Sequence, residues 1–417
     1  MRDVYIVGIE STQFKKWPEK SFKDLTREAY LGALTDAGLD SGQDISFGYF
    51  GNCAMHNWKQ GMIRGQACFI PLVREGLFPE RIPIINVEGG CATASMAFHL
   101  AWKEILAGQA EVALAIGVEK IFIPDNLELT FSQYQEGFDN FDMEETYEAY
   151  NEAGARCGKD FNPGPDRTLP MDTYATQACY HMWRHGTTQR QIAVGASKNH
   201  HFGTMNPKAQ YRFEVPVEKV LEDRMISYPL TRSMCAPIGD GAAAAILCSE
   251  DYLKGLDSKV RERAVKIRAS VLTGGKYRGL DEPSLSKVAA DKAYAMSGLK
   301  PADMDLAEVH DATSFCEIYQ MEMLGFCPIG QGGPFVASGA TMLDGVIPTN
   351  TSGGLVSKGH PIGATGISML YELCTQLRGE AGDRQVKDAE LAIQENGGGI
   401  IGLEEAACSV TILERSK

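Results

Sequence analysis

The sequence contains no pair of cysteines in a Cys-x-x-Cys arrangement, although it has 11 cysteines among its 417 residues. An odd number of scattered cysteines argues against a disulfide framework, and the missing pairs argue against a zinc ribbon in this chain. We therefore expect a reducing compartment, predict a cytoplasmic protein, and expect no metal site made by this chain alone.

Positive charge and long apolar runs are also scarce. There are 40 Lys and Arg residues against 54 Asp and Glu residues, and the net charge is −14. Because binding to nucleic acid requires clustered positive charge, we expect no nucleic-acid partner. No apolar run reaches the roughly 18 residues that a membrane-spanning helix needs. The N-terminus enters a β-branched run directly and has no apolar region of a signal peptide.

Short apolar segments alternate with amphipathic ones in the first part of the chain. Residues 4–9, 45–51 and 82–87 have the continuous apolar character of buried strands, whereas 22–37 and 61–76 have helical spacing. This alternation predicts an α/β fold with a parallel sheet that is covered by helices. The length of the chain is sufficient for two domains of ordinary size.

Cys91 follows two glycines and precedes an amphipathic run that continues to Trp102. This pattern predicts a strand-to-helix turn with the thiol at the N-terminus of the helix. The helix dipole there favours the thiolate, which is the nucleophilic form of cysteine. The alternative is a small buried cysteine that packs as an apolar side chain.

His360 lies in the segment from Ser352 to Gly366, which contains five glycines and precedes another helix-like run. Glycines before a helix present backbone N–H groups to an anion or an oxyanion, and a histidine exchanges protons near neutral pH. The alternative is a tight turn with a structural histidine. A third glycine run, residues 397–399, is another place where the bare backbone can approach a ligand. The alternative is a plain turn.

The regular pattern weakens between about residues 120 and 215, which are rich in aromatic and acidic side chains. We expect an inserted lid or loop region there, with helical pieces such as 173–186. The strand and helix pattern restarts near residue 265. A weak internal repeat, in which Cys91 and His360 each open a helix, predicts two similar halves, 1–255 and 256–417. Each half would contribute one helix N-terminus to a central site.

Four motifs occur in the order used by the thiolase superfamily, which this sequence resembles over nearly its whole length. The motifs are Gly-Gly-Cys91-Ala, His310-Asp, Gly359-His-Pro-Ile-Gly-Ala-Thr-Gly366 and Asn396-Gly-Gly398. The resemblance is closest to the sterol-carrier-protein-type branch. It implies a thiolase fold, in which two βαβαβαββ halves pack as five αβαβα layers, and it implies a homodimer.

The resemblance also implies roles for individual residues. Cys91 corresponds to the nucleophile that takes the acyl group, and His360 to the base that activates this thiol and then the thiol of coenzyme A (CoA). His310, together with His360, corresponds to the group that stabilises the enolate oxygen. The backbone N–H groups of Cys91 and Gly398 correspond to the oxyanion hole. CoA is then a co-substrate, and no bound cofactor is implied.

The sequence departs from the family at the second catalytic cysteine. One branch has that cysteine at the position of Asn396, and the sterol-carrier-type branch has it at the position of Ala312. Cys316 is one helical turn further along and is a candidate proton carrier; otherwise water or a histidine must carry the proton. Asn396 and Gly359 are expected to support the site. An alanine at 312 also leaves room for a substituted α-carbon or a bulky acyl group.

The missing thiol and the aromatic lid resemble the catalytic subunit of benzoylsuccinyl-CoA thiolases, enzymes of anaerobic toluene degradation. This narrower resemblance implies cleavage of 2-benzoylsuccinyl-CoA and a small zinc-ribbon and OB-fold partner subunit, which would carry any zinc. The alternatives are an acetyl-CoA C-acyltransferase that acts on a fatty or sterol side-chain 3-oxoacyl-CoA, a sterol side-chain retro-aldolase, and a non-catalytic lipid-binding protein. We also expect a local basic patch that binds the CoA phosphates.

Overall fold

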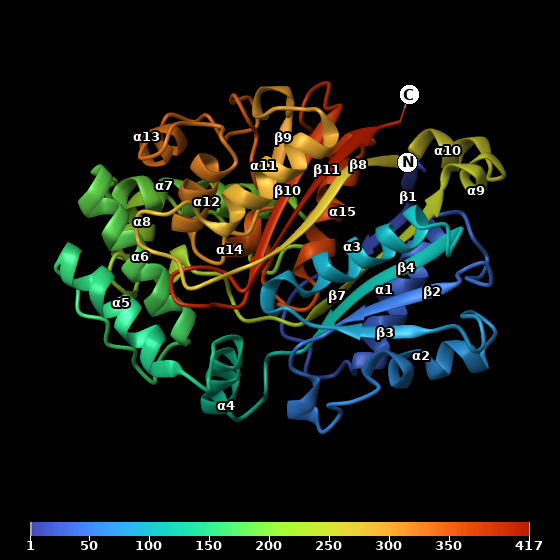
Figure 1. The fold of residues 1–417 in the computed structure, drawn as a ribbon, viewed down its shortest axis with the longest axis horizontal. Helices are drawn as coiled ribbons and strands as arrows, with labels where there is room; N and C mark the ends of the chain where they lie inside the picture. The colour runs from blue at the N-terminus through green and yellow to red at the C-terminus, as the bar shows by residue number, and fades with distance from the viewer. Residues whose placement is uncertain (1, 417) are drawn as a thin grey trace.

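A computed structural model describes residues 2–416, and one nine-stranded mixed sheet runs through it (Figure 1). The strand order is β3-β2-β4-β7-β1-β8-β11-β10-β9, and β5 and β6 form a separate antiparallel pair. The strands are β1 (Val4–Ser11), β2 (Phe47–Gly51), β3 (Ile84–Val87), β4 (Val112–Glu119), β5 (Met225–Ser227), β6 (Leu230–Thr231), β7 (Gly241–Ser249), β8 (Val265–Gly274), β9 (Leu306–Val309), β10 (Leu391–Gly398) and β11 (Ala407–Arg415).

The helices lie on both sides of this sheet and between its two parts. They are α1 (Phe22–Asp36), α2 (Arg64–Arg74), α3 (Thr93–Leu106), α4 (Leu127–Ser132), α5 (Met143–Cys157), α6 (Leu169–His185), α7 (Gln189–Met205), α8 (Val217–Glu222), α9 (Glu250–Lys254), α10 (Ser258–Arg263), α11 (Leu285–Ser297), α12 (Ser314–Met323), α13 (Gly332–Ala337), α14 (Gly354–Lys358) and α15 (Thr365–Leu377). No helix within residues 2–416 is long and apolar enough to cross a membrane.

The prediction of a parallel sheet from the first three strands is wrong for β1. Strand β2 pairs in parallel with β3 and β4, but β1 pairs antiparallel with β7 and β8. Strand β7 also pairs antiparallel with β4, so it lies between β4 and β1. The order of the early strands cannot show this, because β7 comes from a much later part of the chain.

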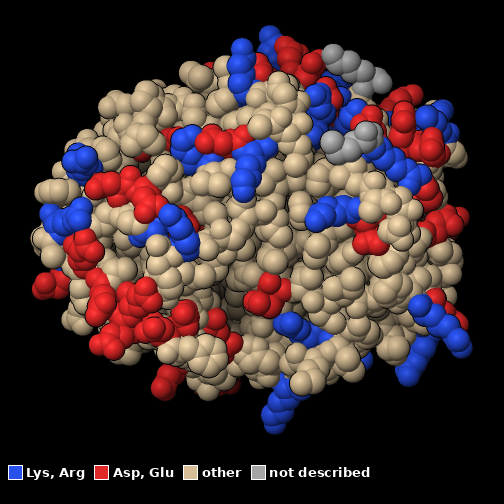
Figure 2. Space-filling model, in the orientation of Figure 1, with Lys and Arg blue, Asp and Glu red and all other residues tan. Residues whose placement is uncertain are grey.

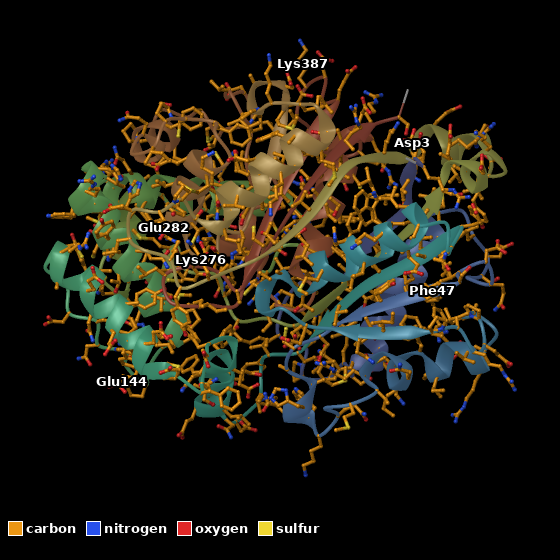
Figure 3. All side chains as sticks on the ribbon, in the orientation of Figure 1. Asp3, Phe47, Glu144, Lys276, Glu282 and Lys387 are labelled. Atoms are coloured by element: carbon orange, nitrogen blue, oxygen red, sulfur yellow. The ribbon has the colours of Figure 1, made fainter. Side chains whose placement is uncertain are left out.

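Two sheet halves meet at β1 and β8, which share only two residue pairs, Tyr5 with Lys266 and Ile6 with Val265. Helices α1 and α2 cover the outer face of the first half, and α11 and α12 cover the outer face of the second. Helices α3 and α15 lie between the halves, where their apolar side chains pack against strands of both. Figure 3 shows side chains filling the space between these layers. The expected five-layer thiolase fold is confirmed.

Local sequence signals explain where several of these helices begin and end. At the start of α1 the Ser21 hydroxyl accepts from the Asp24 backbone N–H at 3.2 Å, and the Asp24 carboxylate accepts from the Ser21 N–H at 2.8 Å. This reciprocal cap satisfies two backbone donors that have no partner inside the helix. Helix α11 ends at Gly298, which has φ of 72°, a conformation that glycine adopts without strain.

Residues 120–215 are far more helical than their sequence pattern suggests. Helix α6 was expected, but α5 and α7, with 15 and 17 residues, were not. The buried face of α7 includes small and polar side chains such as Ala193, Gly195 and Asn199, so the apolar stripe that predicts a helix is weak. Helix α7 packs against α12, α13 and α14, beside which it lies in Figure 1. The segment therefore joins the second half of the molecule.

Candidate active site

Cys91 lies in a short 3-10 turn, Gly90–Ala92, between β3 and the first residue of α3. Gly90 has φ of 55°, and a Cβ atom there would lie 2.5 Å from the Gly399 N. A Cβ atom at Gly398 would lie 2.1 Å from the Ala92 N and 2.6 Å from the Cys91 N. Only glycine fits at these positions, and the backbones of the two halves therefore touch beside the thiol.

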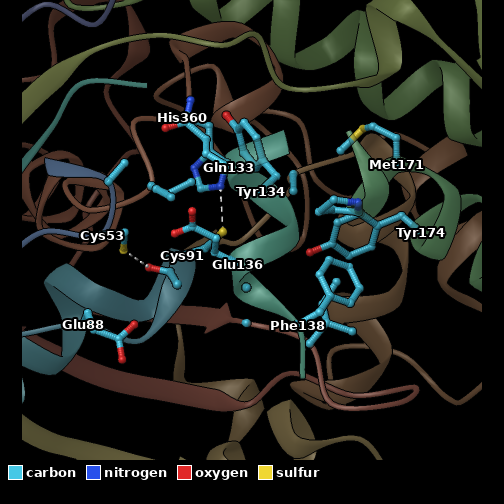
Figure 4. Close-up of a pocket in the computed structure, with 18 residues that line it drawn as sticks. Cys53, Glu88, Cys91, Gln133, Tyr134, Glu136, Phe138, Met171, Tyr174 and His360 are labelled. Atoms are coloured by element: carbon cyan, nitrogen blue, oxygen red, sulfur yellow. Dashed lines mark hydrogen bonds between the residues drawn. The ribbon is translucent and has the colours of Figure 1, made fainter. Parts of the chain in front are cut away.

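His360 is in direct contact with this thiol. Its Nε2 is 3.1 Å from the Cys91 Sγ, the contact drawn as a dashed line in Figure 4. Its Nδ1 is 2.8 Å from the Thr365 Oγ1, and the Thr365 hydroxyl donates to the Pro361 carbonyl at 3.0 Å. Because that hydroxyl has one proton, it accepts from Nδ1–H. The Nε2 atom is then unprotonated and accepts from the Cys91 thiol.

His310, which directly follows β9, completes the cluster. Its Nε2 is 3.5 Å from the His360 Nε2, and the Cys91, His310 and His360 donor atoms all lie within 4.8 Å of one another. The neighbouring Asp311 carboxylate accepts from the Leu355 N–H at 2.6 Å, which ties the end of β9 to helix α14. This bond explains why a His-Asp pair and the distant glycine-rich loop meet at one place.

Burial sets the protonation of all three groups. It raises the pKa of the Cys91 thiol to about 12 and lowers the pKa of His310 to about 4. The pKa of His360 lies well below its usual value because of burial and, to a lesser extent, because a charge on it would be repelled by the neighbouring His310 and Lys358 groups. The helix dipole at this position favours the thiolate, but the cost of burying that charge is larger. The site rests as a neutral thiol beside a neutral imidazole.

A cavity opens over Cys91, and Figure 2 shows the molecular surface hollowed between α4 and the start of α3. Glu88 and Glu136 line this cavity, and no Lys or Arg within residues 2–416 does so. The cavity, which we call the acyl cavity, has mostly apolar and aromatic walls, including Tyr134, Phe138, Met171, Tyr174, Ile362 and Ile400 (Figure 4).

A second cavity, which we call the arginine cavity, joins the first at Ala312 and His360, which line both. Arg167, Arg224 and Arg232 line this second cavity. Arg167 is paired with Asp172 at 2.8 Å and Arg232 with Asp223 at 2.9 Å, whereas Arg224 is exposed and has no ion pair among the described residues. Sequence patterns do not identify these arginines, because they come from separate loops.

The other predicted site residues divide into two groups. Gly359, with φ of 108°, forms the turn before His360, and Gly398 touches the Cys91 turn. Asn396 is fully buried, and its Oδ1 accepts from the Ser95 hydroxyl at 2.8 Å. The Cys316 thiol is 3.4 Å from the Thr313 hydroxyl. Neither Asn396 nor Cys316 lines the acyl or the arginine cavity.

A thiol in contact with a neutral imidazole, beside a second imidazole, is the arrangement of a cysteine-dependent acyl-transfer enzyme. Residues 4–137 match the family model described as thiolase, N-terminal domain, and residues 282–415 match the one described as thiolase C-terminal domain-like. The chain belongs to the thiolase family and is an acyltransferase.

Three relatives show the range of this family. The chain is 35% identical to an acetyl-CoA acetyltransferase of Methanothermobacter thermautotrophicus over 96% of this chain and 98% of that protein. It is 36% identical to sterol carrier protein 2 of Homo sapiens over 98% and 74%. It is 31% identical to the benzoylsuccinyl-CoA thiolase subunit BbsB of Thauera aromatica over 93% and 92%.

Solved structures agree on the fold. The Ltp2-ChsH2(DUF35) aldolase matches with a TM-score of 0.76 and 22% identity over 99% of this chain and 98% of that chain. The Acat5 thiolase from Ascaris suum, in complex with coenzyme A, matches with a TM-score of 0.68 and 16% identity over the full length of both chains. At these identities the likeness concerns the fold alone.

Proposed function

We propose that this protein cleaves a 3-oxoacyl-CoA with CoA through an acyl intermediate on Cys91. The observation that carries the proposal is the 3.1 Å contact between the Cys91 Sγ and the unprotonated His360 Nε2 at the acyl cavity. As Cys91 attacks the 3-oxo carbon, His360 takes the thiol proton, so no buried thiolate has to exist beforehand.

The backbone N–H groups of Cys91 and Gly398 receive the oxygen of the attacked carbonyl. One donor of this kind typically lowers the barrier by roughly 3–4 kcal/mol. When the carbon–carbon bond breaks, His310 and His360 stabilise the thioester enolate that leaves. The Cys91 proton held by His360 is passed on and a proton reaches the α-carbon of the leaving acyl-CoA, so His360 is neutral again. CoA then enters, gives its thiol proton to His360 and takes the acyl group from Cys91, which regains a proton from His360.

The walls of the acyl cavity favour a neutral aromatic or branched acyl group. Aromatic and apolar side chains surround it, and its two charged residues, Glu88 and Glu136, repel an anionic group. The small side chain of Ala312, at the junction of the cavities, leaves room for a substituent on the α-carbon. In 2-benzoylsuccinyl-CoA the benzoyl group is neutral and the carboxylate lies on the α-carbon branch, so this substrate suits both features. The likeness to BbsB supports the same assignment.

CoA enters through the arginine cavity in this proposal. Arg224 and Arg232 are exposed there, and guanidinium groups bind phosphate by paired hydrogen bonds. The thioester then reaches Ala312 and His360 from the side opposite the acyl cavity. A local basic surface of this kind is compatible with a chain that is acidic overall.

We also propose that the chain forms a homodimer and associates with a small zinc-ribbon and OB-fold subunit. A structural relative, the Ltp2-ChsH2(DUF35) aldolase, contains a DUF35 partner, and any zinc would belong to that subunit. Co-purification with a candidate zinc-ribbon and OB-fold subunit, followed by measurement of the mass of the complex in solution, tests this assembly. A monomer that is fully active alone would contradict it.

A panel of 3-oxoacyl-CoA thioesters tests the reaction. It compares aryl with alkyl acyl groups, with and without α-substituents, in the presence of CoA and any subunit that purifies with the protein. We expect the fastest cleavage for α-substituted aryl substrates, followed as loss of the 3-oxoacyl-CoA absorbance. Cleavage without CoA would instead indicate a retro-aldolase, and binding without cleavage a lipid carrier.

A further inference from the structure

Thiolytic cleavage leaves an electron pair on the α-carbon, and some group must deliver a proton to it. The two positions where the family carries a second thiol are Ala312 and Asn396 in this chain. Asn396 is bonded to Ser95 and lies outside both cavities, and so does the Cys316 thiol near Thr313. With these thiols set aside, the proton comes from water, a histidine or another residue of the acyl cavity.

Tyr174, on helix α6, lies where such a donor is needed. Its side chain lines the acyl cavity together with Cys91 and Ala312, and it packs in the same buried cluster as Ala312. In Figure 4 the Tyr174 ring extends from α6 into the cavity. Its hydroxyl end points toward Cys91. The space left by the missing thiol at 312 is thus next to a phenol.

The Tyr174 hydroxyl has no hydrogen-bond partner among residues 2–416, although the residue as a whole is only 9% exposed. The buried phenol of Tyr150, outside the cavity, is bonded by contrast: its hydroxyl accepts from the Gln177 Nε2 at 3.0 Å. A buried hydroxyl usually has a partner, and one that faces a cavity without a partner is placed to meet a ligand. Burial and the nearby Cys316 and Cys91 thiols raise the pKa of Tyr174 well above its usual value, so the phenol carries its proton at neutral pH.

We propose that Tyr174 is the catalytic residue that protonates the α-carbon, in place of the second thiol of other thiolases. This inference rests on the proposed function and names the proton donor of the same reaction. The Cys91 sulfur bonds to the 3-oxo carbon, the bond to the α-carbon breaks, and its electron pair takes the phenol proton. The phenolate regains its proton from the His360 imidazolium, and neutral His360 then takes the proton of the incoming CoA thiol, whose sulfur attacks the acyl group. The imidazolium of His360 returns its proton to the released Cys91.

The substitution Tyr174→Phe tests this role, because carbon protonation can be measured apart from acyl transfer. Transfer of a benzoyl group from benzoyl-CoA to isotopically labelled CoA needs Cys91 and His360 but no carbon protonation. Uptake of deuterium into the α-carbon of succinyl-CoA or acetyl-CoA in deuterium oxide needs the carbon acid–base group. We expect Tyr174→Phe to lower deuterium uptake and cleavage by about 10²- to 10⁴-fold, the usual contribution of general acid–base catalysis. Benzoyl transfer should persist.

Four further variants sharpen the result. Tyr150→Phe, a buried phenol outside the cavity, is the matched control and should keep all three activities. Tyr174→Phe combined with Ala312→Cys should regain cleavage, because it restores a thiol where the sterol-carrier-type branch has one. Tyr134→Phe and Cys316→Ala probe the two other candidate donors; if either of them alone abolishes deuterium uptake while Tyr174→Phe does not, the inference is overturned.

Failure of this inference differs from failure of the proposed function. If the wild-type protein neither cleaves any substrate of the panel nor transfers benzoyl groups, the proposed function fails. If the wild-type protein is active and the Tyr174→Phe variant catalyses deuterium uptake into the α-carbon equally fast, only the proposed role of Tyr174 is wrong. If Tyr174→Phe loses benzoyl transfer as well, the double variant decides: recovered cleavage supports the role, and no recovery overturns it.

Discussion

The Cys91 turn and the His360 loop both contain glycines and both precede a helix of the middle layer, yet they are held very differently. Cys91 is partly exposed to its cavity, and its side chain makes one hydrogen bond, to His360. The His360 loop is buried and bonded throughout: Ser352 donates to the Glu308 carboxylate at 2.8 Å and His360 is bonded to Thr365. The base is therefore fixed, whereas the nucleophile is free to move with its acyl group.

This difference matters because a thioester carbon must be reached by a sulfur that shifts during the reaction. A base that keeps its position and tautomer can serve two thiols in turn, that of Cys91 and that of CoA. Substitutions in the two loops should therefore have different consequences, and the following tests probe the contrast.

The largest effect is expected for Cys91→Ser, which removes the only acyl acceptor of the mechanism. A hydroxyl is a much weaker nucleophile here, and we expect cleavage to fall by at least about 10⁴-fold, as for the loss of a catalytic nucleophile elsewhere. The measurement is the initial rate of loss of the 3-oxoacyl-CoA absorbance. Full activity in this variant would rule out the acyl-cysteine route.

His360→Ala should have the next largest effect, a loss of about 10²- to 10⁴-fold in cleavage, because both thiols lose their base. Benzoyl transfer to labelled CoA should fall in parallel, since it depends on the same base. Turnover close to that of the wild type would show that another group activates the thiol.

Lys198→Met tests the packing that fixes the His360 loop. The Lys198 ammonium is buried, is paired with Glu317 at 2.5 Å and donates to the Thr349 carbonyl at 2.7 Å. Its removal leaves the Glu317 carboxylate buried without its cation, which typically costs about 3–5 kcal/mol of stability. Urea unfolding measures this change. Lys219→Met, in the exposed pair with Glu222, is the control and should leave the midpoint unchanged.

Thr365→Val has nearly the same shape but removes the oxygen that accepts from the His360 Nδ1–H. One hydrogen bond is worth about 1 kcal/mol, so we expect roughly a fivefold loss of kcat, mainly from imidazoles in the wrong tautomer or orientation. The substitution Thr375→Val, on the partly exposed side of the same helix, is the comparison. Equal losses in both would indicate a general effect on α15.

The pH profile should show the smallest change. The pKa of His360 is lowered, so this histidine stays unprotonated, and active as a base, when the pH falls below the usual histidine value of about 6.5. We therefore expect kcat/KM to stay level from neutral pH to below about 6.5 and to decline only at more acidic values. A decline centred near 7 would mean that His360 is more solvated than its burial indicates.

Most elements of regular structure could be predicted from the sequence because their apolar spacing is local. The helix that ends at Gly298 is an example, whereas the contact of Cys91 with His360 was expected only from the family resemblance and the internal repeat. The place of β7 between β4 and β1 could not, since strand pairing depends on distant segments. The raised pKa of the Cys91 thiol could not be predicted either, because a sequence shows the position of a residue on a helix but not how deeply it is buried. Tyr174 comes from the segment with the weakest pattern, and its neighbour Ala312 is far away along the chain.

The contact between Cys91 and His360 spans 269 residues of sequence, which has a consequence during synthesis. At about 5–20 residues per second, the ribosome adds the base only tens of seconds after the nucleophile has been made. Until then the thiol has neither a base nor the Gly398 N–H beside it. An incomplete chain therefore cannot capture acyl groups from the CoA thioesters around it, and reactivity appears only when the last part of the protein has folded.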